Sequence, residues 1–203
     1  MKTTVKNNMA KLAFTLVEMI GVLAVIAILA GMLIPKIFEA IRNSHINATL
    51  EAYNTLKAAA LENYAKWGRF ADTNGTQYTG TNFDQVLFTE GRIDARAAEK
   101  IPLSTAGGTG NVYVSVTTGP GRGNSGYDLD GDGTKETANA AYTVELVINS
   151  VAAKDAHDLS LRLDGPALST TDETSEDTKG RVEYTTPTGS PKVTTVYMYI
   201  AHQ

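Results

Sequence analysis

The chain has 203 residues, with 22 acidic and 18 basic side chains and a formal net charge of −4. This length allows one domain of ordinary size with an attached anchor and excludes a large multidomain protein. The acidic balance supplies no basic stripe for a phosphate backbone, so no specific nucleic-acid partner is indicated. The chain has no cysteine, which excludes disulfides, thiolate metal ligands and cysteine nucleophiles.

The N-terminal end combines a basic leader with an apolar run. Residues 1–13 carry three lysines and no acidic residue, so we expect this end to stay in the cytoplasm and the rest of the chain to lie outside. Residues 14–34 are apolar except for Thr15 and Glu18. As a helix this run measures about 30 Å, which spans a bilayer core and exceeds the apolar part of a signal peptide. We therefore predict a retained, single-pass transmembrane helix.

Glu18 is the one charged residue in this apolar run. A carboxylate in hydrocarbon costs about 3 kcal/mol, and the run contains no cation to pair with it. One interpretation is that Glu18, close to the start of the segment, reaches the lipid headgroups. The other is that Glu18 has a partner outside its own chain.

The local string favours the second interpretation. Ala13-Phe14-Thr15-Leu16-Val17-Glu18 resembles the processing site of the type IV pilin and type II secretion pseudopilin family, in which a proline commonly stands where Pro35 does here. The resemblance implies that prepilin peptidase cuts between Ala13 and Phe14 and that Phe14 becomes N-methylated. It also implies that Glu18 accepts the charge of a neighbouring subunit's Phe14 amine. The family usually has Gly before the cut, and this chain has Ala13.

The resemblance implies a structural filament subunit and not an enzyme, most closely a pseudopilin of a type II secretion-type apparatus. Such a subunit lies in the bacterial inner membrane with its head in the periplasm or outside the cell. It then self-associates into a helical filament on an inner-membrane assembly platform. Two alternatives stay open: a major or minor pilin of a surface filament used for adhesion, motility or DNA uptake, and a monomeric membrane-anchored calcium-binding domain.

Residues 35–67 continue the helical pattern as an amphipathic segment, with Pro35 as a predicted kink. A coiled-coil seam would be short and lack charged flanks, so we expect burial against a sheet. Gly68 is predicted to end the helix. The apolar stripe recurs every three or four residues and comprises Ile46, Leu50, Tyr53, Leu56, Ala60, Tyr64 and Trp67.

Residues 68–203 read as a β-rich extracytoplasmic head. A short helix is expected within 83–93, and alternating or β-branched residues predict strands at 112–117, 142–151, 158–163, 181–185 and 193–200. The predicted fold class is α+β. A long N-terminal helix, transmembrane in its first half, carries an antiparallel meander of four or five strands on its C-terminal half. The resemblance implies that this is the ladle-like architecture of pilins.

An acidic loop is the densest group of candidate ligands in the head. Asp128, Asp130 and Asp132 alternate before Gly133, and Thr134 and Glu136 follow. This spacing fits the first half of a calcium loop, with three side chains, the Thr134 carbonyl and a direct or water-mediated Glu136 as ligands. The twelfth position holds Asn139 where an EF-hand has Glu, so a solvated hairpin tip is the alternative. The resemblance adds that major pseudopilins are stabilised by calcium in this region.

Three other patterns are interpreted structurally. Residues 172–177 are acidic but lack the alternation and the glycine, which is typical of a solvated loop. Residues 121–126 fit G-x-G-x-x-G but run into the acidic loop, so they predict a turn and not a dinucleotide site. The three histidines, His45, His157 and His202, show no metal or catalytic spacing, and the sequence indicates no active site.

Overall fold

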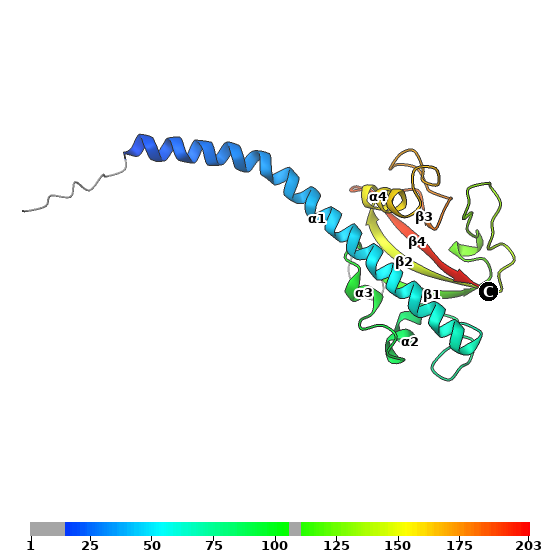
Figure 1. Ribbon diagram of the computed structural model, residues 1–203. Helices are drawn as coiled ribbons and strands as arrows, with labels where there is room; N and C mark the ends of the chain where they lie inside the picture. The colour runs from blue at the N-terminus through cyan, green and yellow to red at the C-terminus, as the bar shows by residue number, and fades with distance from the viewer. Residues whose placement is uncertain (1–14, 106–110) are drawn as a thin grey trace, which may run out of the picture. The chain divides into compact units, whose positions relative to one another are not determined.

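The computed structural model describes residues 15–105 and 111–203, which form an α+β protein (Figure 1). The described residues fall into two compact units, one ending at Ile41 and one beginning at Arg42. In chain order the elements are α1 (Leu16–Trp67), α2 (Phe83–Thr89), α3 (Ala97–Lys100), β1 (Val112–Thr118), the 3-10 turn η1 (Arg122–Asn124), β2 (Tyr142–Ala152), α4 (Ala153–Leu163), β3 (Val182–Tyr184) and β4 (Val193–His202).

The first unit consists of the N-terminal part of α1. All its residues from Thr15 to Ile41 are exposed. This part makes α1 long and apolar enough to cross a membrane. By length and composition alone, it could be a membrane span or a signal anchor.

The second unit contains a four-stranded antiparallel sheet in the order β1-β2-β4-β3. Val114, Leu146, Met198 and Val182 lie opposite one another on the four strands in turn, and all four are buried. Because side chains alternate between the two faces of a strand, this row marks one face of the sheet as the core face.

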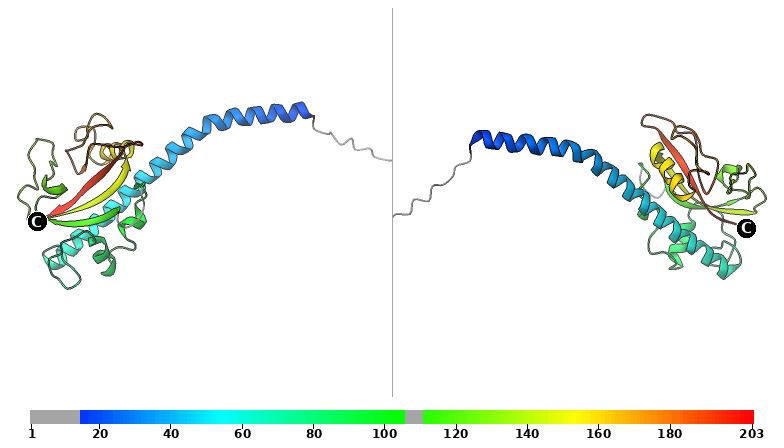
Figure 2. Two further views of the ribbon diagram at one scale, coloured as in Figure 1. Left: turned by 180° about the vertical axis from the view of Figure 1, so that it is seen from behind. Right: turned by 45° about the horizontal axis from the view of Figure 1, so that its top comes forward.

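The C-terminal half of α1 contributes to the same core, as predicted, and Figure 2 shows it lying next to the sheet. Tyr53 is buried, and its hydroxyl donates to the carbonyl of Tyr199 at 2.5 Å. The buried stripe differs from the predicted one at its edge. Tyr64 is 38% exposed, whereas Asn63 is buried because its side chain pairs with both backbone groups of Ala71.

Gly68 follows the helix directly, as predicted. Its φ is +65°, a conformation that glycine adopts without steric cost, and its N–H donates to the carbonyl of Tyr64 at 2.7 Å. The left-handed conformation of Gly68 turns the chain toward Ala71. The side chain of Asn63 then binds the backbone of Ala71.

The strand predicted at 158–163 is wrong, because these residues belong to α4. Ala156, Leu159 and Ser160 are buried at helical spacing, which the alternation of Leu159, Leu161 and Leu163 concealed. Arg42 on α1 pairs with two acids of α4, at 3.2 Å from Asp155 and 2.7 Å from Asp158. The polar face of α4 therefore lies against α1.

The predicted meander is also wrong. A meander would place the strands in chain order, but β4 lies between β2 and β3. The helix α4 and a long loop separate β2 from β3, so β4 takes the place beside β2 and the short β3 pairs only with β4.

Candidate functional site

The acidic loop brings together the four carboxylates that its spacing predicted. Asp128, Asp130, Asp132 and Glu136 each place an oxygen within 4.8 Å of the others, so the group could hold a metal ion. Asp128 is buried and the other three are exposed. Among the described residues, no other acidic, histidine or cysteine group of three or more brings its ligand atoms this close.

Backbone N–H groups shape the loop around these carboxylates. Asp128 accepts from Gly131 at 2.8 Å and from Gly133 at 3.1 Å, one at each carboxylate oxygen. Both glycines have positive φ, +82° and +92°, so the chain turns twice within three residues. The N–H of Leu129 donates to Glu136, which closes the loop across its base. These hydrogen bonds hold the carboxylate oxygens of the loop close together without a bound ion.

Two further predicted ligands have local partners. Asp132 accepts from the N–H of Thr134 at 2.6 Å, and this bond lowers the pKa of the Asp132 carboxyl. Asp130 accepts from the N–H of Asp132 at 3.1 Å. A carboxylate oxygen has two lone pairs, so each of these groups can still coordinate a cation. The role of the Thr134 carbonyl as a ligand stays a prediction.

Hard cations such as calcium and magnesium take oxygen ligands. Four carboxylates within 4.8 Å also repel one another, and a bound divalent cation removes that repulsion. The donor set therefore fits a hard divalent cation. It gives no preference for calcium over magnesium.

The loop is anchored on the face of the sheet opposite α1. Glu183 on β3 has a fully buried side chain and pairs with Arg122 at 2.7 Å and Lys135 at 3.4 Å. It also accepts from the N–H of Asp128 at 3.3 Å. Burial raises the pKa of Glu183 to about 7, although Arg122 and Lys135 act to lower it. Glu183 therefore joins both ends of the acidic loop to β3.

A second buried carboxylate fixes the start of the same segment. Glu145 on β2 accepts from the hydroxyl of Tyr127 and from the N–H of Arg122, both at 2.8 Å. Burial raises the pKa of Glu145, and burial followed by the charge of Glu145 raises that of Tyr127. Sequence reasoning missed these anchors because the residues lie far apart in the chain.

The N-terminal segment places Glu18 in the first turn of α1. The Thr15 N–H and hydroxyl each donate to Glu18 Oε2 at 2.9 Å, and the Glu18 N–H donates back to Thr15 Oγ1 at 3.3 Å. These reciprocal bonds form a capping box. Ala13 and Phe14, the predicted processing site, lie outside the described residues. Pro35 lies inside α1, and a kink there stays a prediction.

The remaining patterns have structural roles. Residues 122–124 form a 3-10 turn. A dinucleotide site would have the start of an α-helix there, so the prediction that the glycine pattern is a turn is confirmed. The second acidic loop is exposed from Asp172 to Glu176, but Asp177 is buried and accepts from the Ser160 hydroxyl at 2.7 Å. The expectation of a fully solvated loop is thus wrong at Asp177.

No protein-family model, no curated protein and no solved structure matches this chain.

Proposed function

We propose that this chain is a structural subunit of a type IV pilus-like filament, most closely a pseudopilin of a type II secretion-type apparatus. The contrast between the two halves of α1 carries the proposal. Up to Ile41 the helix is exposed and mostly apolar, whereas from Ile46 onward one face of it is buried in the core of an α+β head. An apolar surface of this extent needs cover, which a bilayer supplies before assembly and neighbouring subunits supply afterwards.

Glu18 supplies the assembly signal in this proposal. After cleavage before Phe14, the new amine would lie one residue before Thr15, at the positive end of α1. A buried carboxylate and a buried amine are each costly alone, so pairing them between subunits favours one axial register. The capping box gives Glu18 a second, local role, and a test must separate the two.

Three variants separate charge from capping. Glu18→Gln keeps a side-chain oxygen for the cap and removes the charge, Glu18→Ala removes both, and Thr15→Ala removes the capping hydroxyl and keeps the charge. We expect both Glu18 variants to insert into the inner membrane but to yield no filaments, while Thr15→Ala still assembles. Immunoblots of membrane and sheared-filament fractions measure both properties. Normal filaments from Glu18→Gln would contradict the role of the charge.

A surface pilin is the alternative within the same family. A pseudopilus acts in protein export, whereas retracting surface pili give twitching motility or DNA uptake. Deleting the chain and scoring these three properties distinguishes the two assignments. Loss of export with normal twitching and uptake supports the pseudopilin, and the reverse pattern supports the pilin.

The acidic cluster favours a second property, calcium binding in the head. Calcium would neutralise carboxylates in a chain without disulfides and so stabilise the loop. Calorimetry on the detergent-solubilised full chain should show binding of calcium at millimolar concentration or below. Asp130→Ala should abolish it, and Asp172→Ala in the other acidic loop should not. A wild-type chain with neither heat nor a calcium-dependent rise in melting temperature would remove this claim.

A further inference from the structure

The short hairpin that follows α1 contains an asparagine–glycine pair. Asn74 is the only asparagine of the chain that a glycine follows. An isolated bridge between Ala71 and Gln77 closes the hairpin around this pair. Within it, the Gly75 N–H donates to the Asp72 carbonyl at 3.1 Å, and the φ of Gly75 is +82°. This pattern is typical of a three-residue hairpin loop that ends in a left-handed residue.

Two features of the hairpin require glycine at position 75. The positive φ of Gly75 disfavours any residue that carries a Cβ. A Cβ there would also lie 2.6 Å from Cζ3 of Trp67, the only tryptophan of the chain, so the indole ring packs directly on Gly75. The fold therefore keeps a glycine after Asn74, and no side chain at position 75 shields the peptide nitrogen from the asparagine.

The side chain of Asn74 has no partner that would hold it away from that nitrogen. Asn74 is exposed, and its side-chain amide forms no hydrogen bond within residues 15–105 and 111–203. The hydrogen bonds of the turn involve the backbone instead. Asp72 Oδ1 accepts from the N–H of Asn74 and from the N–H of Thr76, both at 2.9 Å. Asp72 thus fixes the backbone of the turn and leaves the amide of Asn74 unbonded.

We propose that Asn74 is a site of spontaneous deamidation. The backbone nitrogen of Gly75 attacks the side-chain amide carbon of Asn74 and loses its proton, and the side-chain nitrogen leaves as ammonia. The product of this step is a cyclic succinimide. Water then opens the ring at either carbonyl, which leaves an aspartyl or an isoaspartyl residue at position 74. The reaction consumes only water and adds one negative charge to the turn, and it is independent of filament assembly.

The hydrogen bonds of the turn set the rate of this reaction. The Gly75 nitrogen donates to the Asp72 carbonyl, so the turn must open before this nitrogen reaches the Asn74 side chain. The two bonds that Asp72 Oδ1 accepts from the backbone oppose this opening. Asp72→Ala removes both bonds and should speed deamidation about tenfold, since exposed hydrogen bonds each contribute modestly to stability.

The isoaspartyl product changes the geometry of the hairpin as well as its charge. In this product the backbone runs through the former side chain, which lengthens the three-residue loop by one methylene group. Gly75 then no longer lies in its original position under the ring of Trp67. Because the chain has no other tryptophan, the fluorescence of Trp67 reports this change directly.

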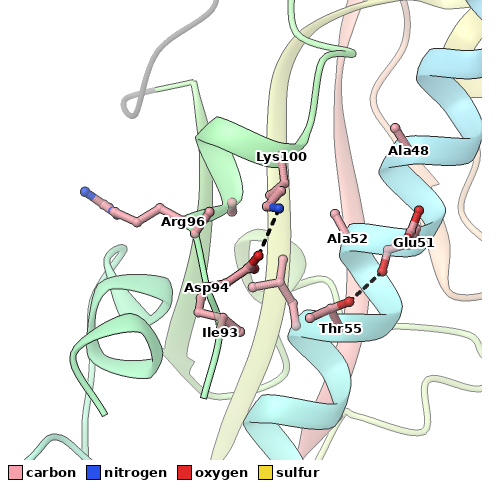
Figure 3. A pocket seen from close by; sticks show the side chains of 11 residues that line it. Ala48, Glu51, Ala52, Thr55, Ile93, Asp94, Arg96 and Lys100 are labelled. Carbon is pink, nitrogen blue, oxygen red and sulfur yellow. Dashed lines mark hydrogen bonds and ion pairs between the residues drawn. The ribbon is translucent and has the colours of Figure 1, made fainter. Parts of the chain in front are cut away.

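Two other exposed asparagines serve as internal controls in the same chain. Asn54 precedes Thr55, a β-branched residue inside α1 whose hydroxyl donates to the Glu51 carbonyl at 3.0 Å (Figure 3). Asn124 lies in η1 and precedes Ser125, whose N–H donates to the carbonyl of Arg122 at 3.2 Å. Both following residues carry side chains, so we expect both asparagines to keep their amides far longer than Asn74.

Ageing of the purified chain tests the site. The detergent-solubilised full chain is incubated at physiological pH and temperature, and its peptides are followed by mass spectrometry with fragmentation that distinguishes aspartyl from isoaspartyl residues. We expect the peptide that contains Asn74 to convert to both products. Loss of the amide at Asn74 no faster than at Asn124 would overturn the proposal.

Two variants separate the chemistry from the turn that restrains it. Asn74→Gln keeps an amide but requires a larger ring, so we expect neither conversion at position 74 nor a drift in Trp67 fluorescence. Asp72→Ala should convert faster than the wild-type chain. Equal conversion in these two chains would overturn the restraint by the turn, and equal fluorescence drift in Asn74→Gln and the wild-type chain would overturn the link to Trp67.

Discussion

Glu90 lies in a small cluster beyond the end of α1. Arg92 pairs with it at 2.7 Å, Asn63 donates to it at 3.0 Å, and Lys66 and Trp67 each approach it at 3.4 Å. Burial acts to raise the pKa of Glu90, but the hydrogen bonds from Arg92, Asn63 and Trp67 outweigh it and lower the pKa to about 2. The folded state therefore favours the ionised carboxylate.

This depressed pKa predicts an acid limb of stability. The stabilisation is present above the unfolded value of about 4.5 and is lost as pH falls through that value toward 2. The full pKa difference corresponds to about 3 kcal/mol in the free energy of unfolding, which solvent screening reduces to about 2 kcal/mol. Glu90→Gln should lower stability at pH 7 and flatten this limb. Urea unfolding of the detergent-solubilised chain at several pH values measures both, and a limb of unchanged slope in Glu90→Gln would contradict the assignment.

Gly131 and Gly133 test the packing of the acidic loop. Both have positive φ, but a Cβ on Gly131 would lie 2.6 Å from Leu168 Cδ2, whereas a Cβ on Gly133 meets no atom within 4 Å. We expect Gly133→Ala to cost about 1 kcal/mol from backbone strain alone and Gly131→Ala about 2 to 3 kcal/mol. Urea unfolding midpoints measure the difference. Equal midpoints would mean that Leu168 moves aside freely.

At the scale of elements, Asn63 joins α1 to the turn that follows it. Its side chain accepts from the Ala71 N–H at 2.9 Å and donates to the Ala71 carbonyl at 3.1 Å, and both residues are buried. Asn63→Leu leaves these backbone groups unpaired, so we expect a loss of about 2 to 4 kcal/mol in unfolding free energy. Asn54→Leu on the exposed face of α1 should change it by less than about 0.5 kcal/mol.

Elements with a strong local signal were predictable from the sequence. Periodicity and turn residues predicted the end of the long helix before Gly68. They also predicted strands at 112–117 and 142–151, each of which is one residue longer in the structure. The helix α4 was not predictable in this way. Its leucines alternate as in a strand, and the buried positions that show helical spacing include the small residues Ala153 and Ala156, which give a weak apolar signal. Strand order was likewise out of reach, since it depends on pairings between distant segments.

The candidate metal loop was likewise predictable only in its local part. The alternation of Asp128, Asp130 and Asp132 predicted the carboxylate cluster, because its geometry is local. The support from Glu183 was not predictable, because its contacts to Arg122 and Lys135 join residues about 50 to 60 positions apart. The sequence around a charged residue in a short strand does not indicate that a distant arginine pairs with it.

At the scale of the whole molecule, the N-terminal part of α1 is the surface that needs cover. Residues 15–41 are exposed, and the run up to Ile34 is apolar except for Thr15 and Glu18. In the filament account a bilayer covers this surface before assembly and neighbouring copies cover it afterwards. In a monomeric anchored domain the bilayer alone covers it.

Processing of the N-terminus tests the filament account most directly. The measurement is the mass of the N-terminal peptide of the chain, taken from membranes of the native host. The account predicts a chain that begins at Phe14 and carries one added methyl group. A chain that still begins at Met1, in cells whose prepilin peptidase cuts other substrates, would contradict it and leave the membrane-anchored calcium-binding domain as the better description.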